Sequence, residues 1–81
     1  MRIKEAAVRH EGEIFTGRNH KVAIFKAITK TRIAPVLTVN QGFVTECGKF
    51  VGRTEAARIA FEAGQIPERK DCLYSEDLSG D

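Results

Sequence analysis

Two Gly-Arg steps carry the chemistry that this sequence suggests. Gly17-Arg18 and Gly52-Arg53 each stand at the expected start of a helix. A helix N-terminus leaves four backbone N–H groups unpaired and carries the positive end of the helix dipole. A glycine there lets an anion approach the backbone, and an arginine adds a planar fork that fits phosphate or carboxylate. The two steps therefore predict anion binding at both helix starts.

The residues that follow the two arginines extend this candidate site. Asn19 and Thr54 add polar groups, and His20 adds an imidazole. The predicted ligand-binding residues are Arg18, Asn19, His20, Arg53 and Thr54. The alternative is that both glycines are ordinary helix caps. The arginines are then solvated, or they pair with Glu13 or Glu55.

The sequence gives no grounds for catalysis or for a metal. No spacing brings a nucleophile, a base and oxyanion donors together, so we expect no enzyme activity. A zinc site needs four ligands with close-paired spacing, whereas the available ligands are far apart in the sequence. These ligands are Cys47, Cys72, His10 and His20. We therefore expect no catalytic residue, no metal and no cofactor.

Length and composition favour one small soluble domain spanning residues 1–81. The 81 residues are 42% hydrophobic and 30% charged, which is typical of a globular chain. Thirteen basic and eleven acidic residues leave a net charge of +2, too small to indicate a nucleic-acid binder by itself. No apolar run is long enough for a membrane span, and the N-terminus lacks a signal-peptide core. We expect a cytoplasmic protein with two free thiols.

Apolar spacing and turn residues predict the secondary structure. Strands are expected over residues 3–9, 13–16, 43–45 and 49–51. A first helix runs from residue 17 to about residue 30, capped by Thr16 or Gly17, with an apolar stripe of Val22, Phe25 and Ile28. A second helix covers residues 53–63 and ends at Gly64. Residues 31–40 form a loop with a short extended stretch at 36–39, and residues 75–81 form a flexible tail. We expect four phenylalanines in the core: Phe25, Phe43, Phe50 and Phe61.

The two halves of the chain echo each other. A shift of 35 residues places the segment 11–18 on the segment 46–53, with Phe15 on Phe50 and Gly17 on Gly52. Each half reads as strand, turn, strand, helix. The predicted fold is α+β, with one small antiparallel sheet, two helices on one of its faces and a ββα-ββα pseudo-repeat. The alternative is that two hairpin–helix units share the same local pattern by chance.

The chain resembles a family of small phage and prophage proteins across nearly its whole length. The resemblance rests on five segments: Thr16-Gly17-Arg18-Asn19-His20, Gln41-Gly42-Phe43-Val44-Thr45, Gly48-Lys49-Phe50-Val51-Gly52-Arg53-Thr54-Glu55-Ala56-Ala57, Ala63-Gly64-Gln65-Ile66 and Leu73-Tyr74-Ser75-Glu76-Asp77-Leu78. It implies a phage accessory protein made in an infected bacterium. Such proteins act by binding: they block a host defence protein or sequester a nucleotide signal.

Three functions follow, and all three involve binding. The first is a non-enzymatic, anti-defence protein that holds an anionic small molecule, such as a nucleotide signal, at the Gly-Arg helix starts. The second is an interaction module that inhibits a host bacterial protein. The third is weak nucleic-acid binding through Lys21, Lys26, Lys30 and Arg32. A core this small also favours a homodimer. We expect no membrane partner, and we place the protein in the host cytoplasm.

Overall fold

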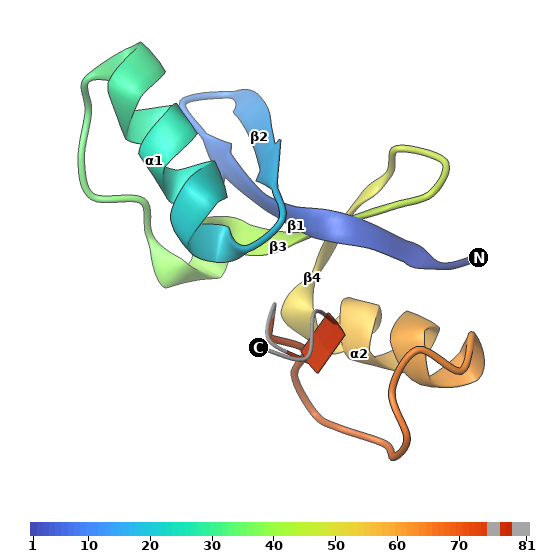
Figure 1. Ribbon diagram of the computed structural model, residues 1–81. Coiled ribbons are helices and arrows are strands. Elements are labelled where there is room, and N and C mark those ends of the chain that lie inside the picture. Colours follow the sequence, from blue (N-terminus) through green and yellow to red (C-terminus); the bar gives the residue numbers. More distant parts are fainter. Residues whose placement is uncertain (75–76, 79–81) are drawn as a thin grey trace.

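The chain folds as two successive ββα units that share one sheet (Figure 1). The computed structural model describes residues 1–74 and 77–78, with the side chain of Thr38 excepted. The elements are β1 (Ile3–His10), β2 (Glu13–Gly17), α1 (His20–Thr31), the short 3-10 helix η1 (Thr38–Asn40), β3 (Gln41–Thr45), β4 (Phe50–Gly52) and α2 (Arg53–Glu62). The strand order is β2-β1-β3-β4, and every neighbouring pair is antiparallel. This architecture confirms the predicted α+β fold.

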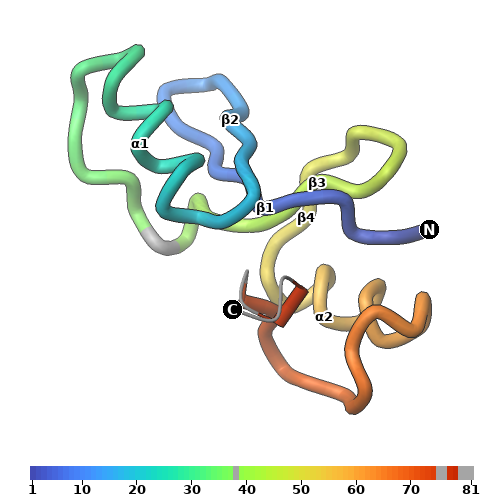
Figure 2. Tube along the Cα trace, in the orientation of Figure 1, coloured from blue at the N-terminus to red at the C-terminus, as the bar shows by residue number. Residues whose placement is uncertain are grey.

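Both helices pack on the same face of the sheet. Side chains two residues apart on a strand share a face, so Ala6 and Val8 of β1 point to the same side. Ala6 pairs with Phe43 of β3 and lies in the cluster beneath α2, whereas Val8 pairs with Phe15 of β2 and lies in the cluster beneath α1. The two helices therefore cover different halves of one face (Figure 2).

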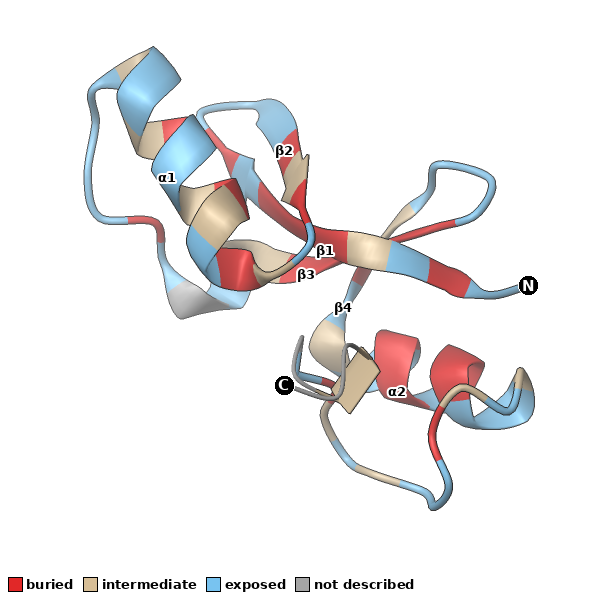
Figure 3. Cartoon of the chain, in the orientation of Figure 1, coloured by how far each residue is buried: buried red, intermediate tan, exposed pale blue. Residues whose placement is uncertain are grey.

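Alanines let the helices approach the sheet closely. The buried face of α1 is formed by Ala23 and Ala27, and α2 buries Ile59 among several alanines. Burial is concentrated where the helices meet the sheet (Figure 3). The cluster beneath α2 also takes in Leu73, which is fully buried. The larger of the two cores thus depends on the segment that follows α2.

The central strands pair with an approximate two-fold symmetry. Ala7 and Gly42 are 35 residues apart, the same shift that relates the two halves of the sequence, and they pair directly. On one side of this pair Ala6 faces Phe43, and on the other side Val8 faces Gln41. Because the same shift carries Ala6 onto Gln41 and Val8 onto Phe43, exchanging the two units preserves the pairing.

The outer hairpins break this symmetry by one residue. Phe15 pairs with Val8 on the helix-covered face, whereas its counterpart Phe50 pairs with Val44 on the opposite face. A one-residue change of register reverses the face of every side chain. The prediction that Phe50 belongs to the core is therefore wrong. Phe50 is half-buried on the open face, where the guanidinium of Arg9 lies 4.9 Å from its ring centroid.

The turns explain this change of register. Glu11 and Gly12 close the first hairpin as a two-residue turn, both with positive φ, as a tight antiparallel turn requires. The second hairpin has a longer loop in which Gly48 takes a φ of 88° and Thr45 N–H donates to the Lys49 carbonyl at 2.9 Å. The extra loop residue shifts β4 relative to β3.

The predicted apolar stripe of α1 is correct only in part: Ile28 packs against the cluster beneath the helix, but Phe25 does not. The helix buries His20, Ala23 and Ala27, while Phe25 is 70% exposed. Phe15 and Val8 already fill the space above the sheet, so small side chains fit beneath the helix and a phenylalanine does not. Phe61 is likewise exposed at 36%, so the prediction that Phe25 and Phe61 lie in the core is wrong.

The connection after α1 and the C-terminal segment differ from expectation in detail. The Ala34–Pro35 bond is cis. Residues 38–40 form η1 in place of the expected extended stretch. Leu78 packs against the cluster beneath α2. The predicted flexible tail, residues 75–81, lies mainly outside the described residues. Within the described ranges, no helix is both long enough and apolar enough to cross a membrane.

Replacing Gly42 by alanine is expected to lower the free energy of unfolding by about 3 kcal/mol, because overpacking forces the backbone to move. A Cβ at this position would lie 2.2 Å from the Val51 carbonyl oxygen and 2.9 Å from Phe50 Cζ. Gly52→Ser is the matched control, since a Cβ there meets nothing within 4 Å and serine is a good helix cap. Urea unfolding measures both variants. Equal stability of Gly42→Ala and wild type would contradict the close approach.

Candidate functional site

The first Gly-Arg step lies before its helix rather than at its start. Asn19 is the N-cap of α1, and its Oδ1 accepts a hydrogen bond from the Val22 N–H at 2.9 Å. The predicted cap, Thr16 or Gly17, is therefore wrong, because the helix begins at His20 and Asn19 satisfies a first-turn donor there. Gly17 instead lets Val22 pack closely: a Cβ at Gly17 would lie 2.8 Å from Val22 Cγ1. Arg18 is exposed in the two-residue connection.

The second step stands at its helix start, as the sequence predicts. Gly52 is the N-cap of α2 in extended geometry and provides no side-chain hydrogen bond, and Arg53 is the first helical residue. Glu55 lies in the first turn, where a negative charge suits the helix dipole.

The Arg53 side chain turns inward rather than toward solvent. Its Nη2 donates to Gln41 Oε1 at 3.0 Å and lies 3.5 Å from His20 Nδ1. The Tyr74 ring centroid lies 5.2 Å from its Cζ, within the range of a cation–π contact. Its Nε is buried without a hydrogen-bond partner among the described residues. The guanidinium is thus held between β3, α1 and the segment after α2.

His20 links three elements of the fold. Its Nε2 lies 2.7 Å from the Gly42 carbonyl oxygen, which only accepts, so Nε2 carries the proton and Nδ1 is left to accept from Arg53. The imidazole also meets the Phe43 ring edge-on, with centroids 4.8 Å apart. Burial lowers the pKa of His20, and the nearby Arg53 charge lowers it further against the opposing effect of the Gly42 hydrogen bond. We therefore describe His20 as neutral at pH 7.

The five predicted site residues do not gather around one cavity. His20 and Arg53 are in contact, Asn19 is engaged as a cap, and Arg18 makes no hydrogen bond or ion pair with the part of the chain that is described. Thr54 is exposed and lines a cavity of about 620 Å³. Asn19 and Thr54, which follow the two arginines, thus have different roles: Asn19 caps a helix and Thr54 lines a cavity.

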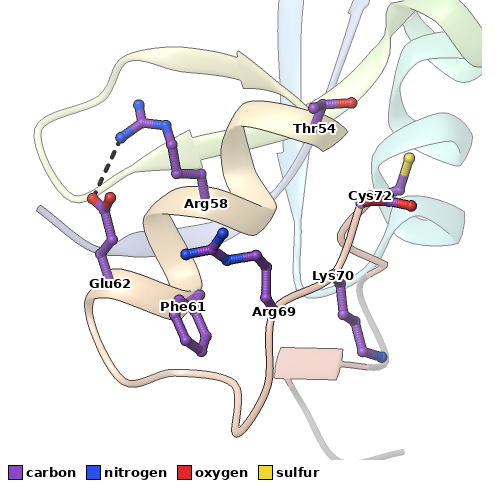
Figure 4. A pocket seen from close by; sticks show the side chains of 8 residues that line it. Thr54, Arg58, Phe61, Glu62, Arg69, Lys70 and Cys72 are labelled. Carbon is purple, nitrogen blue, oxygen red and sulfur yellow. Dashed lines mark hydrogen bonds and ion pairs between the residues drawn. The ribbon is translucent and has the colours of Figure 1, made fainter.

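This cavity, here called the α2 groove, lies between α2 and the segment 69–72 (Figure 4). It is lined by Thr54, Arg58, Phe61, Glu62, Arg69, Lys70, Asp71 and Cys72. Of these, only Thr54 is among the ligand-binding residues predicted from the sequence. The sequence does not predict the groove, because its two walls, α2 and residues 69–72, are brought together only by the turn between them.

The cations of the α2 groove have different partners. Arg58 pairs with Glu62 at 3.3 Å and approaches Glu55 at 3.9 Å, both on α2. Lys70 Nζ donates to Asp77 Oδ1 at 2.6 Å, a hydrogen bond that lowers the pKa of Asp77. The Arg69 guanidinium lies 5.5 Å from the Phe61 ring centroid. Arg69 has no ion pair within residues 1–74 and 77–78, so its charge is available to a ligand in the groove.

No group of described residues is arranged to bind a metal. Three or more His, Cys, Asp or Glu side chains do not come together anywhere in residues 1–74 and 77–78. Cys47 lies exposed on the β3–β4 hairpin loop, where its Sγ is 3.1 Å from Thr45 Oγ1, a contact that lowers the pKa of the thiol. Cys72 lines the α2 groove.

The free energy of unfolding is expected to fall as the pH drops below about 6.5, the ordinary pKa of histidine. The folded-state pKa of His20 is lowered, so the unfolded chain takes up this proton first, and one such group changes stability by at most about 1.4 kcal/mol per pH unit. His20→Gln keeps a donor and an acceptor but does not titrate, so its stability should vary less between pH 7.5 and 5. Urea unfolding across this range measures the difference. An identical pH profile in the variant would show that the buried imidazole does not resist protonation.

Comparison with known proteins agrees with the resemblance seen in the sequence. Neither curated proteins nor solved structures include a match to the chain. A family model described as the phage T4 y16D protein matches residues 2–78, which is nearly the whole chain. The expectation of a small phage protein family is confirmed. The chain belongs to the phage T4 y16D protein family and is a small phage accessory protein.

Proposed function

We propose that this protein is a non-enzymatic phage accessory protein that holds an anionic small molecule, such as a nucleotide signal, in the α2 groove. The observation that carries the proposal is Arg69, whose guanidinium lies over Phe61 at the groove without a carboxylate partner in the described chain. A guanidinium in this position offers a fork that fits phosphate oxygens. The groove's volume of about 620 Å³ lies within the range of small-molecule sites.

The groove combines the two kinds of contact that a nucleotide needs. Thr54 contributes a hydroxyl at the first turn of α2, where the helix dipole favours negative charge and Gly52 provides no side-chain cap. Phe61 offers apolar surface to a base. The ion pairs of Arg58 are exposed and therefore worth little, so a bound phosphate displaces them at low cost.

The proposal retains the anionic ligand expected from the sequence and moves its site. Arg53 is occupied by Gln41 and Tyr74, and Asn19 is occupied by the helix cap. Thr54 is the predicted residue that lines the α2 groove. We propose that binding in the host cytoplasm withdraws the ligand from a host defence system, consistent with membership of a phage protein family.

A second candidate function is inhibition of a host bacterial protein by direct contact. It is favoured by the connection between α1 and β3, where Leu37 is 56% exposed and Val39 is 83% exposed. Exposed apolar side chains in a short segment are typical of contact surfaces. A homodimer through this connection would use the same surface. The mass of the purified protein alone shows whether it forms a homodimer. The mass after mixing with host lysate shows whether a host protein binds.

Arg69→Ala is expected to weaken nucleotide binding by about 10-fold to 100-fold, the loss typical for a charged hydrogen bond. Isothermal titration with ATP, a cyclic dinucleotide and inorganic phosphate measures the effect. Lys4→Ala on β1 is the matched control, because it removes an exposed cation outside the groove. With no Trp and one Tyr in the chain, a nucleotide that copurifies dominates the absorbance near 260 nm. Unchanged binding by Arg69→Ala, or no binding of any of these anions, would overturn the proposal.

A further inference from the structure

The charges of this protein are segregated along the chain. Residues 14–45 contain no Asp or Glu, and all eleven acidic residues lie outside this segment. Within it are five basic residues, on α1 and at its two ends: Arg18, Lys21, Lys26, Lys30 and Arg32. The helix α1 and its two ends are therefore strongly basic, although the net charge of the whole chain is only +2.

The outer face of α1 carries an aromatic side chain among these cations. Lys21, Phe25 and Thr29 follow one another at four-residue spacing, opposite the buried Ala23 and Ala27, and all three are exposed. Arg32, the C-cap, is exposed at the end of the helix. Figure 3 shows exposed residues alternating with intermediate and buried ones along α1. We call Arg18, Lys21, Phe25 and Arg32 the α1 surface.

Phe25 has no role in the core that would explain its type. It is 70% exposed, and Phe15 and Val8 fill the space beneath α1 without it. A phenylalanine ring has no polar group to interact with water, so its position among cations points to a partner that offers both negative charge and a flat apolar surface.

Three of the five cations are available to such a partner. Lys30 pairs with Glu13 at 2.5 Å, and Lys26 donates to the Thr16 carbonyl at 2.9 Å, so both are committed to β2. Arg18, Lys21 and Arg32 form no ion pair in the portion of the chain that the structure describes. The available cations are the ones that share the α1 surface with Phe25.

We propose that the α1 surface binds single-stranded nucleic acid. Arg18, Lys21 and Arg32 neutralise backbone phosphates, and an unpaired base stacks on the Phe25 ring, the combination that sequence-tolerant single-strand binders use. A protein partner fits less well, because this surface has no acidic side chain to pair with the cations of a partner. Nucleic-acid binding is the third function expected from the sequence, and the 70% exposure of Phe25 adds the aromatic side chain that a single-strand surface needs.

Fluorescence anisotropy with a labelled twelve-nucleotide oligo(dT) tests the proposal. Three phosphate contacts predict that the affinity falls about 20-fold between 50 and 200 mM salt, since the logarithmic slope for single strands is roughly 0.7 per contact. Phe25→Ala is expected to weaken binding at constant salt by about 10-fold, and Phe25→Tyr, which keeps the ring, restores it. Because Phe25 is exposed, its replacement leaves the fold intact.

The controls separate this surface from other exposed cations. Lys4→Ala on β1 should bind the oligonucleotide as wild type does, and Lys21→Ala should weaken it. Absence of oligonucleotide binding at 50 mM salt would overturn the proposal. So would Phe25→Ala binding with wild-type affinity, because the ring is then not a stacking platform. Binding of poly-L-glutamate with the same dependence on salt and on Phe25 would replace nucleic acid by an acidic protein as the partner.

Discussion

The hydrogen bond from His20 to the Gly42 carbonyl fixes how the two halves of the molecule fit together. Each ββα unit is too small to bury much apolar surface alone, so the pair depends on the contact between them. His20 reaches from α1 to β3 and also receives the Arg53 guanidinium at the start of α2. Gly42 has no side chain because Val51 and Phe50 occupy that space. One imidazole and one glycine thus tie α1, the central strands and α2 together.

This constraint decides which residues remain available for binding. A buried, neutral imidazole that donates to a backbone carbonyl is committed to structure, and the Arg53 side chain is committed with it. Arg53, His20 and Asn19, which the sequence predicts to bind an anion at the helix starts, are therefore already occupied by contacts inside the fold. The proposed functions use two surfaces away from His20 and Arg53. One is the α2 groove, where Arg69 has no carboxylate partner among the described residues, and the other is the α1 surface around Phe25.

Much of the fold could be predicted because its local signals agree. The strand, turn, strand, helix pattern of each half and the Gly64 that follows α2 each point to the element observed. The order of strands and helices follows from the echo between the two halves. These signals are local, so a single sequence is enough to identify them.

The misses in the core and at the site share a cause, because they depend on packing between distant segments. Phe15 and Phe50 occupy equivalent places in the echo, yet a longer second turn sends Phe50 to the open face. Phe25 has the spacing of a core residue, but the space beneath α1 is already filled. The α2 groove is formed by a helix and by a segment that returns to it after a turn. Local sequence patterns therefore predict neither the register of a strand pair nor the position of a cavity.

The most direct test of this account is the long-range nitrogen–proton NMR spectrum of the two histidine rings at pH 7, recorded with and without ATP. We expect His20 to be neutral with its proton on Nε2, and its signals not to move when ATP binds, because the nucleotide occupies the α2 groove. A charged imidazole, a proton on Nδ1 or a shift of the His20 signals with ATP would contradict the structural role given to His20 and Arg53. A shift of the His20 signals with ATP would place the ligand at the helix starts instead of the α2 groove.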